Sequence, residues 1–303
     1  MTTKTTQTVD AAAAGTWTLG DRTVNRLGFG AMRLTGSAAF DLGSSRDREQ
    51  SIRVLRRAVE LGVDHIDTAA FYFSRLRSAN ELINRALAPY PDELTIVTKV
   101  GPGRDASGAW LSWATPGQLR GQVEENLRQL GRDHLDVVNL RLNGPGPLSD
   151  HFGALAELRE AGLIRHLGLS NIGPEHLAEA QAIAPVVCVQ NRYGLASRPD
   201  RSGDLLRICG EQGIAFVPFF AIAGEGREGG AAPDGAGDDD AVLAVARAHG
   251  ATPAQVRLAW TLGQGGHVLA IPGTGNPDHL AENVAAGALR LTADEMALLD
   301  AAR

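Results

Sequence analysis

The feature that most constrains the fold of this chain is the repeated alternation of short apolar runs with longer segments of helical periodicity. Eight such runs, rich in β-branched and aliphatic residues, occur along the 303 residues. A parallel sheet covered by helices requires this alternation. We therefore predict strands at residues 26–30, 64–67, 94–100, 135–142, 165–169, 186–190, 214–219 and 268–271.

Helices are predicted between and after these strands. Residues 48–61 show the signal best, because their apolar residues fall on one helical face. A longer periodic segment at 241–262 contains Gly250 and Pro253, which are expected to break it. The remaining predicted helices cover residues 79–87, 116–130, 152–161, 174–183, 205–212, 277–285 and 292–301.

Eight strand–helix units predict a single (β/α)8 barrel of the TIM type, an α/β fold. A length of 303 residues would also allow two domains of about 150 residues each, but no Pro/Gly-rich linker with a shift in composition divides the chain. We expect residues 1–15 to be a loose N-terminal tail and residues 16–303 to form the barrel. Residues 16–24 contain a Gly-Asp turn and predict a hairpin that plugs the bottom of the barrel.

One segment has a different composition from the rest. Residues 223–240, directly after the seventh predicted strand, contain six Gly and six acidic residues and almost no apolar side chain. Because the loops that follow the strands of a barrel carry its active site, this flexible loop is a candidate lid. A solvated insertion without a function is the alternative.

Composition excludes several classes of protein. A net charge of −6 and the lack of any Lys/Arg-rich cluster argue against a nucleic-acid binder. The two cysteines form neither a CxxC pair nor a disulfide framework, and no apolar run is long enough for a signal peptide or a membrane span. The eight His are scattered without a metal-ligand spacing. We expect a cytoplasmic protein without a metal.

The use of lysine singles out one position. Of the 29 basic residues only Lys4 and Lys99 are Lys, and Lys99 lies in an apolar strand. Asp67 ends the preceding strand, and Tyr72 follows in the loop after it. These three side chains can act as one unit, in which Asp67 pairs with Lys99 and Lys99 polarises the hydroxyl of Tyr72 as a proton donor. A buried ion pair that only fixes packing, with Tyr72 covering the mouth, is the alternative.

Several motifs, in order along nearly the whole chain, resemble those of the aldo-keto reductases. The closest likeness is to bacterial members similar to the pyridoxal reductases. The motifs are Thr23–Gly36, Asp-Thr-Ala-Ala-Phe-Tyr at 67–72, Thr98-Lys99, Val137–Arg141, Gly-Leu-Ile-Arg-His-Leu-Gly-Leu-Ser-Asn at 162–171, and Ile-Pro-Gly-Thr-Gly with Glu-Asn within 271–283. Together they are specific, although each one alone is weak.

The resemblance implies a nicotinamide cofactor that lies extended across the barrel mouth, without a separate dinucleotide-binding domain. The segment from Gly28 to Arg33 agrees, because it lacks the third glycine of the dinucleotide fingerprint. The implied cofactor contacts are Gly30, Ala31 and Met32 at the nicotinamide ribose, Asp67 beside them, Ser170, Asn171 and Gln190 at the carboxamide, Phe219 on the ring face, Ile222 and Gly224 at the pyrophosphate, and Thr274, His279, Glu282 and Asn283 at the adenosine end. Considered alone, Phe219 could be core filler and Gln190 a buried amide.

The chain departs from the family pattern after the fourth strand. The family usually has a His there, where this chain reads Asn139-Leu-Arg-Leu-Asn143-Gly144. Ungapped alignment puts Gly144 at the position of that His, and a one-residue deletion puts Asn143 there. The usual fourth catalytic residue is therefore absent, and Asn143 is the candidate to replace it. An amide there, or Arg141, can orient a carbonyl by donating a hydrogen bond, but neither is an acid near neutral pH.

A second departure concerns the 2′-phosphate of the cofactor. Many members place a Lys and an Arg where this chain has Gly273 and His279. Thr274, the backbone N–H groups that follow it and the start of the helix at Pro277 still offer an anion site. We expect NADPH to be preferred, with NADH as an alternative.

The resemblance thus implies an NADPH-dependent reductase of an aldehyde or ketone, with Tyr72 as proton donor and pyridoxal, reduced to pyridoxine, as the first substrate to consider. One alternative is a reductase or dehydrogenase of another small carbonyl compound or sugar. Another is a regulatory barrel that binds the cofactor but turns over little. The sequence names neither the substrate nor the oligomeric state.

Overall fold

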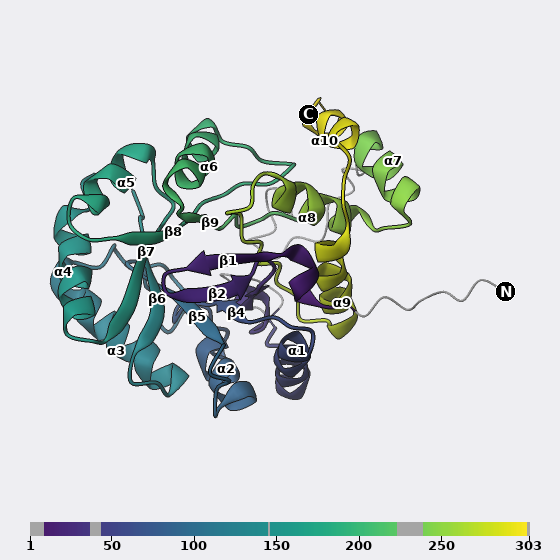
Figure 1. Ribbon diagram of the computed structural model, residues 1–303. Coiled ribbons are helices and arrows are strands. Elements are labelled where there is room, and N and C mark those ends of the chain that lie inside the picture. Colours follow the sequence, from purple (N-terminus) through teal and green to yellow (C-terminus); the bar gives the residue numbers. More distant parts are fainter. Residues whose placement is uncertain (1–8, 37–43, 145, 223–238, 302–303) are drawn as a thin grey trace.

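The computed structural model describes residues 9–36, 44–144, 146–222 and 239–301. Gly224 and residues 223–238 of the predicted lid lie outside these ranges. Within them, seven strands form one parallel sheet in the order of the sequence (Figure 1). The strands are β3 (Phe29–Gly30), β4 (His65–Asp67), β5 (Thr95–Val100), β6 (Leu135–Arg141), β7 (Ile164–Ser170), β8 (Val186–Gln190) and β9 (Ala215–Phe216).

The sheet closes into a barrel through the eighth predicted strand. Val268 forms a parallel bridge to Phe216, and Ala270 forms one to Leu27, so this segment joins β9 to the residues before β3. The segment pairs through single bridges instead of a continuous ladder, which is why it is not a regular strand. The prediction of a single (β/α)8 barrel is confirmed.

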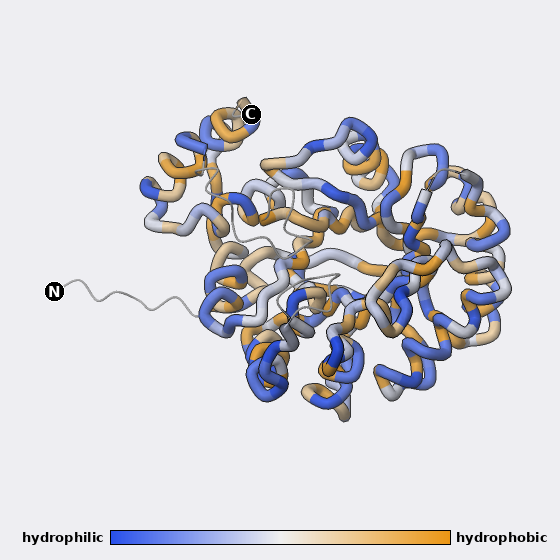
Figure 2. The backbone as a smooth tube through the Cα atoms, turned by 180° about the vertical axis from the view of Figure 1, so that it is seen from behind, coloured by the Kyte–Doolittle hydropathy of each residue, from blue (hydrophilic) through white to orange (hydrophobic). Residues whose placement is uncertain are grey.

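Helices surround the sheet, and the tube in Figure 2 shows hydrophilic and hydrophobic stretches alternating along them. The turn between α7 and α8 follows from the sequence, because Gly250 has a left-handed φ of 58° and Thr252 caps the next helix ahead of Pro253. The helices are α1 (Arg48–Glu60), α2 (Ala79–Leu87), α3 (Pro116–Leu130), α4 (Ser149–Glu160), α5 (Pro174–Gln181), α6 (Asp200–Gln212), α7 (Asp240–His249), α8 (Pro253–Gly263), α9 (Pro277–Ala285) and α10 (Ala293–Ala301), with short 3₁₀ turns η2 (Ala31–Arg33) and η4 (Ala286–Ala288).

The predicted hairpin fills the lower end of the barrel. Strands β1 (Thr16–Leu19) and β2 (Arg22–Asn25) pair antiparallel across the Gly-Asp turn. Leu19 and Val24 pack with residues of the barrel interior, among them Val97 and Cys188. Since alternate residues of a strand share a face, the residues two positions beyond these, Lys99 and Gln190, also point inward, one layer nearer the mouth. The core below thereby positions the polar residues above it.

The expected loose tail is wrong for its described part. Residues Ala11–Ala14 form the 3₁₀ helix η1, in which Ala11 and Ala14 are buried. The backbone N–H of Ala11 donates to Leu61 O at 2.8 Å. Small alanine side chains allow this close packing, which the composition of the segment did not predict.

Arg26 connects this turn to the lower rim of the barrel. Its guanidinium donates to the carbonyl oxygens of Ala14, Leu262, Gly265 and Val268. One side chain therefore joins η1, the end of α8 and the segment that closes the sheet.

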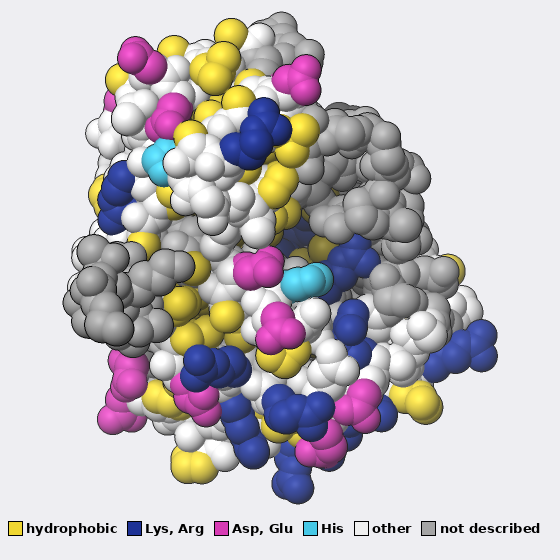
Figure 3. Space-filling model, turned by 90° about the vertical axis from the view of Figure 1, so that its right-hand side faces the viewer, with side chains coloured by type: hydrophobic (Ala, Val, Ile, Leu, Met, Phe, Trp, Pro, Cys, Tyr) yellow, Lys and Arg dark blue, Asp and Glu magenta, His cyan; other side chains and the backbone are white. Residues whose placement is uncertain are grey.

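The surface near α7 and α9 carries both signs of charge. Figure 3 shows acidic and basic side chains interspersed on this face. No helix in the described part of the chain is long and apolar enough to cross a membrane.

Candidate active site

A cavity opens at the carboxyl ends of the strands. Its walls come from β3 and η2, from the ends of β4, β5, β6 and β8, and from the segments after β9 and after the eighth strand. The described residues that line it are Gly30, Met32, Arg33, Asp67, Tyr72, Lys99, Arg141, Gln190, Pro218, Phe219, Phe220, Ala221, Ile222, Ile271, Pro272 and Gly273.

Asp67, Lys99 and Tyr72 meet at the bottom of this cavity. Lys99 Nζ donates to Asp67 Oδ1 at 2.6 Å and to Thr68 O at 3.0 Å. The other carboxylate oxygen, Asp67 Oδ2, accepts from Gln190 Nε2 at 2.8 Å. Lys99 Nζ lies 4.9 Å from the centre of the Tyr72 ring. The predicted unit of three side chains is therefore brought together, and its carboxylate is held by two partners.

Burial sets the protonation of this group. Desolvation raises the pKa of Tyr72 above its ordinary 10.0, and the positive charge of Lys99 offsets only part of this. Desolvation is the largest effect on Lys99 and opposes its charge, but the carboxylate of Asp67 and the interactions with Tyr72 together outweigh it and raise the pKa of Lys99 above 10.5. In the free protein Tyr72 is thus a protonated phenol beside an ammonium ion, and Lys99 does not bring its pKa below the ordinary value.

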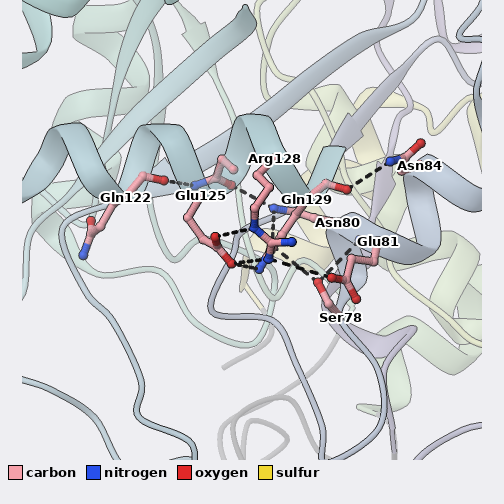
Figure 4. A network of polar contacts seen from close by, with 9 residues as sticks. Ser78, Asn80, Glu81, Asn84, Gln122, Glu125, Arg128 and Gln129 are labelled. Carbon is pink, nitrogen blue, oxygen red and sulfur yellow. Dashed lines mark hydrogen bonds and ion pairs between the residues drawn. The ribbon is translucent and has the colours of Figure 1, made fainter. Parts of the chain in front are cut away.

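The outward-facing neighbours of Asp67 and Lys99 are anchored in the helical layer. Thr68 Oγ1 donates to Asn80 Oδ1 at 2.7 Å, and Thr98 Oγ1 donates to Asn126 Oδ1 at 2.6 Å. Asn80 Nδ2 bridges the two helices by donating to Asn126 Oδ1 at 2.9 Å and to Gln129 Oε1 at 3.1 Å. Figure 4 shows this contact between α2 and α3, with the more exposed pair Glu125 and Arg128 beside it. Asp67 and Lys99 are therefore held from both faces of the sheet.

Arg104 fixes the loop that carries Tyr72. This side chain is only 8% exposed and lies 4.6 Å from the ring centre of Phe73. Its Nη1 donates to Phe71 O at 3.3 Å and to Phe73 O at 3.2 Å, one residue on each side of Tyr72. The sequence signal for this role was weak, because one Arg among 27 gives no indication of what it binds.

The structure brings some of the expected cofactor residues to the cavity and leaves others outside it. Gly30, Met32, Asp67, Gln190, Phe219 and Ile222 line the cavity. Ser170 is buried behind it, 3.5 Å from Gln190 Oε1. The side chain of Asn171 is held elsewhere, since it donates to Leu142 O and accepts from Arg201. The remaining expected residues, Ala31, Thr274, His279, Glu282 and Asn283, do not line the cavity. Ala31 is fully buried, Asn283 is buried in α9, and His279 and Glu282 are exposed.

At the end of the fourth predicted strand the structure places Arg141 at the cavity instead of Asn143. Asn143 is exposed and does not line the cavity. Arg141 does line it, because it is the last residue of β6 and lies two positions beyond the inward-facing Asn139. Its Nη1 lies 3.4 Å from Ser170 Oγ, and its guanidinium is 5.4 Å from the ring centre of Phe219. The correction follows from strand length: β6 ends at Arg141, so Asn143 has left the sheet.

The segment before α9 is organised by its own polar groups. The N–H of Asn276 donates to Thr274 Oγ1 at 3.1 Å, and the N–H of Asp278 donates to Asn276 Oδ1 at 2.9 Å. Arg46, which the sequence did not single out, lies across Gly275 so closely that a Cβ there would collide with its guanidinium. The N–H groups expected to bind phosphate are thus partly engaged, and a positive charge lies beside them.

Two glycines make the seam between the first and last strands. A Cβ on Gly30 would lie 2.6 Å from Ile271 O, and one on Gly273 would collide with Gly30 O. Gly30 therefore serves the closure of the barrel as well as the cavity. Among the described residues no group of three or more potential metal ligands lies together.

Comparisons with known proteins agree with this geometry. The chain matches the aldo/keto reductase family over residues 26–303. It is 45% identical over 295 residues to pyridoxine 4-dehydrogenase of Escherichia coli, which covers 95% of this chain and 98% of that protein. It is 38% identical to an uncharacterized oxidoreductase of Schizosaccharomyces pombe, over 96% of this chain and 91% of that protein.

A solved structure has the same fold. The aldo-keto reductase of Klebsiella pneumoniae in complex with NADPH superposes with a TM-score of 0.78 at 28% identity, over 94% of each chain. The match in sequence, the shared fold and the Asp67–Lys99–Tyr72 cluster at the barrel mouth lead to one conclusion. This chain belongs to the aldo/keto reductase family and is an oxidoreductase of carbonyl compounds.

Proposed function

We propose that the protein reduces an aldehyde with NADPH and that pyridoxal, reduced to pyridoxine, belongs to its substrates. The observation that carries the proposal is the buried cluster of Asp67, Lys99 and Tyr72 in the cavity. The 45% identity to pyridoxine 4-dehydrogenase supports this choice of substrate. The reverse oxidation of the alcohol uses the same groups.

The chemistry of the cavity suits a nicotinamide cofactor. Phe219 offers an aromatic face, while Gln190 offers an amide at the end of β8. The cofactor supplies a hydride to the carbonyl carbon when it is bound. Tyr72 donates the proton to the carbonyl oxygen, and Lys99 stabilises the negative charge that develops on the phenol. Asp67 holds Lys99 in place, and the walls exclude water.

The phosphate end of the cofactor is proposed to lie along residues 272–276, beside Arg46. A guanidinium forms charge-assisted hydrogen bonds with a phosphate, which NADH lacks at its 2′ position. We expect Arg46→Met to weaken NADPH binding by about 10-fold while NADH binding changes little, since a hydrogen bond to a charged group contributes about 1.5–3 kcal/mol. Quenching of protein fluorescence measures both affinities. Equal losses for the two cofactors would show that Arg46 acts on the fold instead.

The experiment that tests the function follows NADPH oxidation by the purified protein with pyridoxal and a panel of small aldehydes. Loss of a general acid costs about 100-fold or more in rate, so Tyr72→Phe should lose at least that much activity while still binding NADPH. Lys99→Arg keeps the charge but not the compact ammonium ion and should also lose about 100-fold. Lys4→Arg, the same change at the other lysine, is the control. A wild type that binds NADPH but oxidises none of it would refute the proposal.

A further inference from the structure

We propose that Arg141 selects carbonyl substrates that carry an anionic oxygen on the atom next to the one bearing the carbonyl group, as in an ortho-oxido aromatic aldehyde. This inference rests on the proposed function and names the substrate class of the same cavity. It starts from the position of the residue. Arg141 pairs in register with Ser170 at the mouth, and its side chain lines the same cavity as Tyr72 and Lys99.

The charges at the site are not balanced within the described protein. The carboxylate of Asp67 is taken by Lys99 and Gln190, with one oxygen for each. Among the residues that the structure describes, no carboxylate forms an ion pair with Arg141. A guanidinium has five N–H donors, and the described contacts of Arg141 use one, to Ser170 Oγ, while its face lies over Phe219. A half-buried cation with free donors beside a cavity is stabilised by an anion that enters it.

Geometry limits where that anion can be. The carbonyl oxygen of a substrate must lie at the hydroxyl of Tyr72 to receive its proton. A guanidinium donates hydrogen bonds without giving up a proton, so Arg141 binds an oxygen and does not protonate it. Its charge also acts on Tyr72, where it lowers the pKa against the larger effect of burial. The guanidinium of Arg141 therefore binds a second substrate oxygen that lies close to the carbonyl oxygen. Because the guanidinium is planar and can form two parallel hydrogen bonds, it favours two oxygens held in one plane, as on neighbouring ring atoms.

The test compares two aldehydes with the same atoms. Salicylaldehyde has its phenol oxygen next to the aldehyde, and 4-hydroxybenzaldehyde has it across the ring. The ratio of their kcat/KM values is measured with saturating NADPH at a pH at which both phenols are ionised. We expect Arg141→Met to lower the ortho/para ratio by about 10-fold, which is the effect of losing one charge-assisted hydrogen bond. Arg141→Lys keeps the positive charge but not the planar guanidinium, so its ortho/para ratio should lie between those of the wild type and Arg141→Met. Arg120→Met removes an exposed arginine of α3 and should keep the wild-type ratio.

Each outcome separates this inference from the function on which it rests. An unchanged ratio in Arg141→Met would overturn it. So would an equal loss for both aldehydes together with weaker NADPH binding by fluorescence, because Arg141 would then serve the cofactor. If Arg141→Met does not fold by circular dichroism, the ratio in Arg141→Lys decides in the same way. A wild type that oxidises NADPH with neither aldehyde nor pyridoxal would refute the proposed function instead.

Discussion

At the scale of single residues, burial governs the protonation of Tyr72 and Lys99. Lys99 and Asp67 are 2% and 4% exposed, and their ion pair at 2.6 Å opposes the desolvation that disfavours the charge on Lys99. Tyr72 is buried beside them, and the positive charges of Lys99 and Arg141 offset only part of the desolvation that raises its pKa. Its phenol therefore keeps its proton in the free protein, which suits a proton donor in the reductive direction.

All three tyrosines of the chain are expected to titrate late. Burial raises the pKa of Tyr72 and of Tyr193 above 10.0, and it raises the pKa of Tyr90 to about 12. Since a raised pKa favours the protonated form, tyrosinate absorbance of the folded protein should not develop as pH approaches 10, the ordinary midpoint. A spectroscopic pH titration measures this, with Tyr72→Phe to assign one transition. A transition below pH 10 that disappears in Tyr72→Phe would contradict the burial argument.

At the scale of elements, successive residues along a strand point to opposite faces of the sheet and make different contacts. Asp67 and Lys99 face the cavity, while Thr68 and Thr98 face outward and bind buried asparagines of α2 and α3. The alternation of side chains along a strand thus lets contacts with the helical layer hold the residues that face the cavity. The register of β4 and β5 and the packing of α2 and α3 are coupled at these two threonines.

Asn126→Leu tests this coupling. The substitution keeps the branching of the side chain but removes the acceptor of the buried Thr98 hydroxyl and one of the two acceptors of the Asn80 amide. We expect a loss of about 2–3 kcal/mol in the free energy of unfolding, the cost of unsatisfied buried polar groups. Denaturant unfolding measures it. Asn143→Leu is the matched control at an exposed position and should stay within about 0.5 kcal/mol of the wild type.

The sequence predicted the elements well where periodicity and caps agree. The bounds of α2, α3 and α9 are those expected, because Ser78 caps α2 and Pro116 and Pro277 start the other two. Helix α6 begins at Asp200, before the predicted start at residue 205. Periodicity missed this first turn because the turn has few apolar residues. Contacts such as Arg104 on the Tyr72 loop and Arg46 across Gly275 join loops far apart in the chain. No spacing in the sequence contains that information.

At the scale of the whole molecule, closure of the barrel depends on few contacts at one seam. The eighth segment is held by single bridges, by the close approach of Gly30 and Gly273, and from below by Arg26. The eighth segment therefore pairs with its neighbours over a shorter length than β5, β6 and β7 pair with each other. At the lower rim, hydrogen bonds from the Arg26 side chain to backbone carbonyls add to the contacts that close the barrel.

Arg26→Met should weaken the whole fold. The substitution keeps the aliphatic stem but removes hydrogen bonds to carbonyls in η1, α8 and the closing segment. We expect a loss of about 3 kcal/mol in the free energy of unfolding, because hydrogen bonds of charged groups contribute about 1.5–3 kcal/mol and do not add fully. Thermal and denaturant unfolding measure it, with Arg207→Met, an exposed residue of α6, as control. Equal stability of the two variants would show that the rim closes without Arg26.

The hairpin β1–β2 also determines from which side the site exchanges with solvent. Leu19 and Val24 pack with Val97, Val137, Cys188, Ala215, Val217 and Leu269, so an apolar layer closes the described lower end of the barrel. Substrate and product therefore enter and leave the cavity through its mouth, at the carboxyl ends of the strands.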